Sequence, residues 1–231
     1  TKGKNAMKII STNVYVGPNV YANFPVIRHQ IDIGELENWP SVKLGDNFIN
    51  GLVSALPTLQ SHGCSYREEG GFLRRLKEDE GTWIGHIWEH VALELQHLAG
   101  SDVTYGKTRS AGKHGCYDVV YQYKQRDVGL EAGQLGLRLL THLMPREVQE
   151  TLVTKVSDDF DFSEELHDFI RMAQRKEFGP STGSLVSAAE ARDIPWLRLN
   201  NYSLVQFGHG KFQKRIQATI TSETKHIAVE I

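Results

Sequence analysis

Two kinds of hydrophobic pattern divide the first part of the chain into predicted strands and helices. Apolar and polar residues alternate over residues 7–16 and 26–33, and residues 116–123 are rich in β-branched and aromatic types, which predicts three strands. Apolar residues recur at helical spacing in four further segments, which predicts helices over residues 46–60, 71–76, 83–99 and 128–143. Two strands, several helices, a strand and a final helix indicate a compact α+β domain.

Proline and polar segments set the ends of these elements. Residues 34–40 are typical of a short turn or a single helical turn that Pro40 stops. Pro57 is expected to kink or shorten the helix over residues 46–60. The small, flexible and cationic segment 105–115 is typical of a surface loop, either solvated or in contact with anions.

The composition changes near residue 156, which predicts a second unit. Residues 156–165 are acidic and lead into a helix that reaches Arg175. The patterns beyond it predict a helix over residues 184–192 and short strands or hairpins over residues 194–199, 213–219 and 227–231. We therefore divide the chain into residues 1–156 and 157–231.

Composition and charge exclude several classes of protein. Of the 231 residues, 40% are apolar and 23% are charged, and the formal net charge of -2 provides no overall basic field for nucleic acid. Cys64 and Cys116 fit a reducing compartment and have no second cysteine at metal-site spacing. No segment approaches the roughly 18 consecutive apolar residues of a membrane span, and no apolar run follows the basic N-terminus. We expect a cytoplasmic protein that binds neither nucleic acid nor a membrane.

The predicted helix over residues 83–99 carries the pattern His86-x-x-Glu89-His90. At about 100° per residue, His90 lies about 40° round the helix from His86, and Glu89 lies about 60° to the other side. All three side chains can therefore reach one point. Two neutral imidazoles one turn apart can bind a metal ion, and a carboxylate beside them can act as general base to a metal-bound water. The order of the three residues is that of the inverted zincins.

A structural interpretation of the same residues is a core helix that holds histidine and glutamate as a hydrogen-bonded pair. A catalytic metal site also needs a third protein ligand. Glu94 and His97 share roughly the same face, but they lie about 6 and 10 Å beyond His90 along the helix axis. Three ligands at such spacing rarely converge on one tetrahedral ion, so the third ligand is expected from outside this helix.

Several longer motifs run through both parts of the chain. The first part contains Gly71-Phe72-Leu73, the segment over residues 85–100 and Tyr105-Gly106-Lys107-Thr108-Arg109. The second part contains Gly179-Pro180-Ser181-Thr182, the turn at Ile194-Pro195-Trp196 and a run over residues 205–219 that begins Val205-Gln206-Phe207-Gly208-His209-Gly210. Together these motifs resemble the cyanophycin synthetase family, and the resemblance covers residues 7–231.

The resemblance implies an enzyme larger than this chain. The family polymerises aspartate and arginine into cyanophycin, a poly-aspartate backbone with arginine on each side chain, using ATP and acyl-phosphate intermediates. It implies that residues 1–156 are an N-terminal α+β domain, and that residues 157–231 are a linker and the first lobe of an ATP-grasp domain. The remaining ATP-grasp lobes and a Mur-ligase-like domain would complete a homo-oligomeric enzyme that uses ATP and magnesium. This chain alone is not expected to ligate.

The resemblance also implies a metallopeptidase-like site in the first domain, which cleaves nascent polymer into primers. By position, His86 and His90 would bind zinc or another divalent metal, and Glu89 would be the general base. We take Glu131, in the otherwise apolar helix over residues 128–143, as the third ligand. A peripheral glutamate without a metal is the alternative for that residue.

Polymer binding requires charges that complement carboxylate and guanidinium groups. The cationic candidates are Arg74, Arg75, Lys107, Arg109 and Lys113. Ordinary solvated charge is the competing interpretation of these side chains.

The first domain is then either a metal-dependent hydrolase of the polymer, or a non-catalytic binding and docking module whose His/Glu cluster is structural. A free-standing small ATP-grasp relative is a third interpretation, and it would require nucleotide binding.

Overall fold

The computed structural model describes residues 7–153 and 155–225, which form two compact units. The first ends at Met172 and includes most of helix α7 (Phe162–Lys176), and the second begins at Ala173. Both units combine helices with an antiparallel sheet, so the predicted α+β class is confirmed. The strand expected over residues 227–231 lies outside the described residues.

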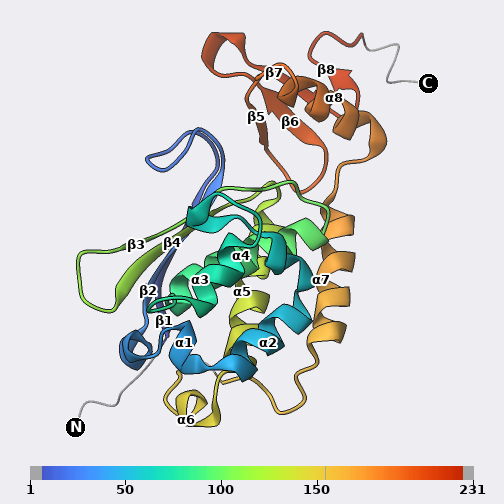
Figure 1. The fold of residues 1–231 in the computed structure, drawn as a ribbon. Coiled ribbons are helices and arrows are strands. Elements are labelled where there is room, and N and C mark those ends of the chain that lie inside the picture. The colour runs from blue at the N-terminus through green and yellow to red at the C-terminus, as the bar shows by residue number, and fades with distance from the viewer. Residues whose placement is uncertain (1–6, 154, 226–231) are drawn as a thin grey trace. The chain divides into compact units, whose positions relative to one another are not determined.

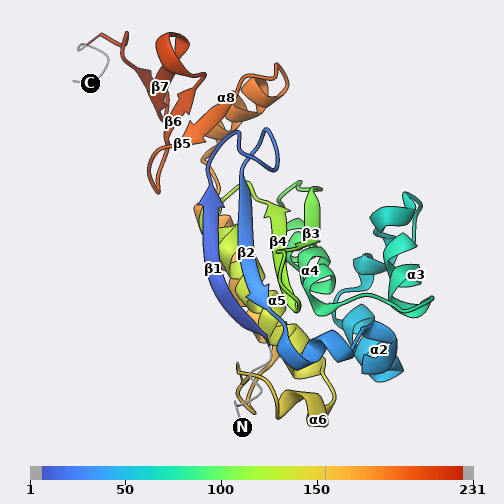
Figure 2. The same cartoon turned by 90° about the vertical axis from the view of Figure 1, so that its left-hand side faces the viewer.

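A four-stranded antiparallel sheet with the order β1-β2-β4-β3 forms one layer of the first unit (Figures 1 and 2). Its strands are β1 (Lys8–Tyr15), β2 (Val26–Asp32), β3 (Gly106–Ser110) and β4 (Cys116–Gln122). Along β2, Ile27, His29 and Ile31 are buried, and the residues between them are only partly buried. The predicted strands β1, β2 and β4 are confirmed, and their alternation reflects one covered face of the sheet.

Strand β3 corrects the prediction of a surface loop over residues 105–115. It pairs with β4, from Gly106 opposite Tyr121 to Ser110 opposite Tyr117. The polar composition was misleading because β3 is an edge strand, in which charged residues face solvent while the neighbouring strand supplies the backbone hydrogen bonds. Only the turn after β3 remains a loop.

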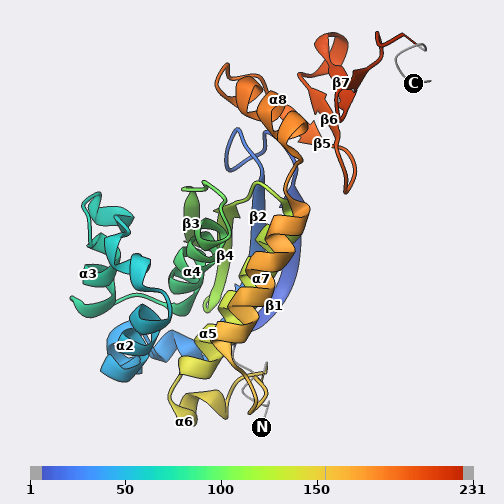
Figure 3. The ribbon, with the colours of Figure 1, turned by 90° about the vertical axis from the view of Figure 1, so that its right-hand side faces the viewer.

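Helices α4 (Ile84–Leu98) and α5 (Arg126–Leu143) pack side by side on one face of this sheet (Figures 2 and 3). The indole N–H of Trp88 donates to the carbonyl of Gly133 at 2.7 Å. A Cβ atom at Gly136 would lie only 2.9 Å from Val91 Cγ1, so glycine permits the close approach of the two helices. Helix α4 therefore packs against both the sheet and α5, and this packing fixes the positions of its side chains.

Shorter helices connect β2 to α4, and among them α3 lies beyond α4 from the sheet (Figure 2). The shorter helices are η1 (Gly34–Asn38), α1 (Ser41–Leu44), α2 (Asp46–Ala55), η2 (Pro57–Ser61), η3 (Cys64–Tyr66) and α3 (Gly71–Lys77). Pro57 ends the predicted helix at Ala55, as expected, and begins a 3-10 turn. Helix α6 (Arg146–Gln149) was not predicted.

The second unit combines helix α8 (Pro180–Glu190) with a sheet of the order β5-β6-β7-β8. The sheet strands and one 3-10 turn are β5 (Trp196–Arg198), β6 (Leu204–Phe207), η4 (Gly210–Phe212), β7 (Lys214–Gln217) and β8 (Ile220–Thr221). Val186, Val205 and Ile216 form its small core. In the whole described part of the chain, no helix has the length and hydrophobicity needed to cross a bilayer.

Candidate functional site

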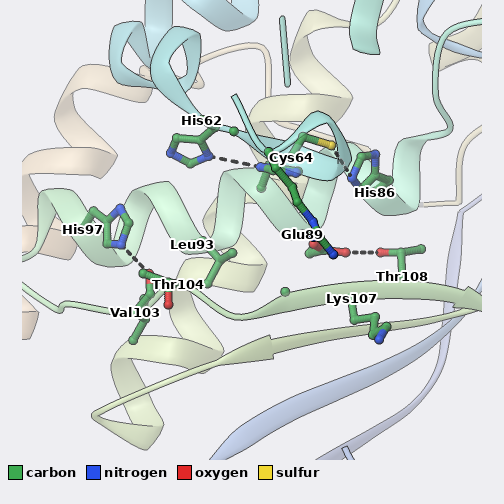
Figure 4. A pocket seen from close by; sticks show the side chains of 14 residues that line it. His62, Cys64, His86, Glu89, Leu93, His97, Val103, Thr104, Lys107 and Thr108 are labelled. Atoms are coloured by element: carbon green, nitrogen blue, oxygen red, sulfur yellow. Dashed lines mark hydrogen bonds between the residues drawn. The ribbon is translucent and has the colours of Figure 1, made fainter. Parts of the chain in front are cut away.

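A cavity of about 670 Å³ opens beside α4 in the first unit (Figure 4). Three segments line it: residues 62–67, which include η3, one side of α4, and strand β3 with the residues just before it. The buried face of α4 fixes the helix, and its opposite face supplies His86, Glu89, His90 and His97 to the cavity. The helical geometry predicted from the His-x-x-Glu-His spacing therefore brings all three residues of the pattern to one cavity.

His86 and Cys64 meet at one end of this cavity. His86 Nε2 lies 3.4 Å from Cys64 Sγ, and His86 Nδ1 lies 2.9 Å from the hydroxyl of Thr82. Burial lowers the pKa of His86 to about 4, and the positive charge of Arg75 contributes further. The ring is therefore neutral at physiological pH, and the Thr82 contact directs its Nε2 toward the cysteine.

His90 completes a cluster of three possible metal ligands. One donor atom from each of Cys64, His86 and His90 lies within 4.8 Å of the others. The His90 ring stacks on Phe72, with 4.1 Å between ring centroids, and its Nδ1 lies 3.1 Å from Nδ1 of His62. Burial lowers the pKa of His90 well below its ordinary value, and the neighbouring His86 and His62 lower it further. A thiolate and two neutral imidazoles are a typical donor set for zinc.

Glu89 lies beside this cluster and is nearly buried, with 4% of its surface exposed. Thr108 on β3 donates a hydrogen bond of 2.6 Å to Glu89 Oε2 (Figure 4). Burial raises the pKa of the Glu89 carboxyl to about 7, although the bond from Thr108 and the charge of Lys107 both act to lower it. A carboxyl with a pKa near the working pH is well suited to general acid–base catalysis.

Gly106 on β3 leaves room for the Glu89 side chain. A Cβ atom at this position would overlap Glu89 Oε1 and lie 2.7 Å from its Cγ. We expect Gly106→Ala to displace the carboxylate and to lower any hydrolytic rate at this site about 100-fold, with cation binding retained. Rates and cobalt binding measured on the same samples test this. Gly179→Ala, at an open position with an ordinary negative φ in the second unit, is the control for replacing a glycine by alanine. An unchanged rate would contradict the expected displacement.

Glu131, which we expected as the third ligand, does not belong to this cluster. It lies on α5, and its carboxylate forms an ion pair of 2.9 Å with Arg138, which also pairs with Glu165 of α7. The third ligand of the cluster is instead Cys64, which we did not predict from the sequence. His62 was also missed. The signal for both was the short segment His62-Gly63-Cys64, which places two metal-binding side chain types two residues apart.

The expected polymer-binding cations lie in different surroundings. Lys107 is exposed and lines the cavity. Arg75 is partly buried, and its charge acts on His86. Arg74 is paired with Glu68 and Glu78 and lies over the ring of Tyr66, whereas Arg109 and Lys113 are exposed on β3 and the following turn. Of these five candidates, only Lys107 lines the cavity, and Arg75 affects it through the pKa of His86. Arg67, which was not among the candidates, also lines the cavity.

Comparison with known proteins adds the evolutionary context of this cavity. A family model described as the cyanophycin synthase-like N-terminal domain matches residues 28–145, about half of the chain. The chain belongs to this family. The matched region contains every residue that lines the cavity, so the cavity is part of the cyanophycin synthase-like domain.

Curated relatives match almost the whole chain. The cyanophycin synthetase of Geminocystis herdmanii is 37% identical over 227 residues, which are 97% of this chain and 25% of that protein. Those of Crocosphaera subtropica and a Synechocystis species are 39% and 38% identical, with the same coverage of both chains. The chain therefore spans about a quarter of the length of the relatives that it matches.

Proposed function

We propose that this chain is the N-terminal region of a cyanophycin-synthesising ligase, and that its cavity binds cyanophycin and hydrolyses it to make primers. The observation that carries the proposal is the arrangement of Cys64, His86 and His90 around one cavity, with Glu89 beside them. The name shared by the relatives supports the choice of polymer.

The three clustered residues fit a divalent cation of zinc type. Catalytic zinc sites use three protein ligands drawn from cysteine, histidine and carboxylates and keep one position open. Thr82 holds His86 by the ring nitrogen that faces away from Cys64, as outer partners of metal-binding histidines usually do. A cation held by Cys64, His86 and His90 would polarise the scissile carbonyl and lower the pKa of a water molecule.

Glu89 is proposed as the general base that takes a proton from the attacking water and returns it to the leaving amine. Burial raises the pKa of this carboxyl in the cation-free protein, and a bound cation would favour its ionised form, which is the form that accepts the proton. Thr108 positions the carboxylate by donating to one oxygen, which leaves the other oxygen for the proton transfer. The buried walls around Glu89 exclude bulk water from this step.

Polymer binding is proposed to depend on cations in and near the cavity. Lys107, which lines the cavity, and Arg75, whose charge acts on His86, would hold carboxylates of cyanophycin by charge-assisted hydrogen bonds. Arg109, Lys113 and Arg74 are proposed to extend this surface along β3 and α3.

For the whole protein, we propose ATP- and magnesium-dependent addition of aspartate and arginine in a homo-oligomer, with residues 157–231 as a linker and the first lobe of an ATP-grasp domain.

A non-catalytic binding module is the second candidate, and one observation favours it. Polar groups around the cavity have partners within the protein, such as Thr108 for Glu89 and Glu94 for His62. Such internal satisfaction is typical of a structural polar network. Clearing of polymer separates the two candidates, because a binding module sediments with the polymer and leaves its turbidity unchanged.

The test incubates the purified chain with insoluble cyanophycin and follows turbidity. With zinc supplied, we expect the suspension to clear, and an excess of chelator should prevent clearing. Sedimentation of the protein with residual polymer should decrease when Lys107 is replaced by glutamate. Unchanged turbidity in the presence of zinc would contradict the proposed hydrolysis, and co-sedimentation alone would support the binding module.

A further inference from the structure

A second group of possible metal ligands lies next to the first. Donor atoms of His62, Glu94 and His97 lie within 4.8 Å of one another. His62 Nε2 is 2.8 Å and His97 Nδ1 is 3.8 Å from the same oxygen, Glu94 Oε2. The Glu94 side chain is only 2% exposed, whereas His97 is 36% exposed at the edge of the cavity. Two imidazoles and one carboxylate are a donor set of catalytic zinc proteins.

Each of these three side chains is oriented by a partner on its far side. The hydroxyl of Thr58 donates to Glu94 Oε1. The ring N–H of His97 at Nε2 donates to the carbonyl of Val103. Nδ1 of His62 contacts Nδ1 of His90 at 3.1 Å. These outer contacts leave Glu94 Oε2, His97 Nδ1 and His62 Nε2 directed toward one another, as outer-shell partners do at metal sites.

We propose that His62, Glu94 and His97 form a second site for a divalent cation of zinc type, and that cations in the two sites exclude one another. The second site stands on its own geometry. The exclusion rests on the function proposed above, in which Cys64, His86 and His90 hold a cation.

The exclusion follows from the one hydrogen shared between His62 and His90. A neutral imidazole carries a single hydrogen, on Nδ1 or on Nε2. A cation bound to His62 Nε2 leaves the hydrogen on His62 Nδ1, which then donates to His90 Nδ1. His90 must then carry its own hydrogen on Nε2, so neither nitrogen of His90 keeps a lone pair for a cation. The first site thereby loses one of its three ligands.

The opposite tautomer opens the first site and closes the second. When His90 Nδ1 carries the hydrogen and donates to His62 Nδ1, His90 Nε2 keeps its lone pair and can bind a cation in the first site. His62 Nε2 then carries a hydrogen and donates it to Glu94 Oε2 at 2.8 Å, which occupies the second site with a hydrogen bond. The position of this hydrogen thus selects which site can bind.

Titration of the full chain with Co²⁺ alone tests the proposal, because cobalt bound to a thiolate gives a near-ultraviolet charge-transfer band and cobalt bound only by nitrogen and oxygen does not. We expect the unsubstituted chain to bind one cobalt ion. His97→Ala should bind one ion with the thiolate band, and His86→Ala should bind one ion without it. The double variant should bind none. His114→Ala, at an exposed histidine in the turn after β3, should behave like the unsubstituted chain.

The outcomes separate the two parts of the proposal from the proposed function. If His86→Ala binds no cobalt, the second site does not exist. If the unsubstituted chain binds two ions, the sites do not exclude one another. If His97→Ala binds none, the first site fails, and the proposed function fails with it. Cys64→Ser, alone and combined with His97→Ala, replaces the His86 variants where those do not fold.

Discussion

Glu89→Gln is expected to lower the rate of cyanophycin hydrolysis by a factor of about 10² to 10⁴ while leaving cation binding intact. Glutamine has almost the shape of glutamate, and its side chain oxygen can still accept the hydrogen bond from Thr108. It cannot accept a proton from water, so it removes only the general base. The initial rate of clearing with zinc supplied measures the loss, and cobalt titration of the same protein measures binding.

Glu147→Gln provides the matched control, because Glu147 is exposed on the short helix α6, in a part of the sequence remote from the site. Its rate of clearing should equal that of the unsubstituted chain. Clearing that persists in Glu89→Gln would show that another group acts as the base. Loss of cobalt binding in Glu89→Gln would show that the carboxylate binds the cation directly or is needed for folding.

The residues of one helix could be placed from the sequence because their arrangement is local. The positions of His86, Glu89 and His90 follow from 3.6 residues per turn, and the structure brings all three to one cavity. Strands β1, β2 and β4 were predictable for a similar reason, since one covered face of a sheet imposes a two-residue period.

Tertiary arrangement decided the features that the sequence did not predict. Cys64 lies in the short 3-10 helix η3, which packs against α3, and no short-range pattern in the sequence describes how that packing brings the thiol to the histidines. On α5, the face with Gly133 and Gly136 approaches Tyr121, Trp88 and Val91. Glu131 shares a different face with Arg138, seven residues later, which explains why its carboxylate does not reach the cavity.

The same substitution of Glu89 is expected to stabilise the cation-free protein at alkaline pH. Burial raises the pKa of this carboxyl from its ordinary 4.5 to about 7. The folded protein therefore keeps the proton at pH values where the unfolded chain has lost it. The free energy of unfolding should fall as the pH rises from about 4.5 to about 7 and stay level above, for a total loss of roughly 3 kcal/mol.

Glutamine does not ionise, so burying it carries no cost that grows with pH. The increase in the free energy of unfolding caused by Glu89→Gln should therefore be larger at pH 8 than at pH 5 by roughly 2 to 3 kcal/mol. Urea unfolding of both proteins with a chelator present measures this difference. The buried histidines affect both proteins equally, so their contribution cancels. A gain that does not change with pH would contradict the raised pKa. Saturating zinc should reduce the gain, because a nearby cation favours the ionised carboxylate that the fold alone disfavours.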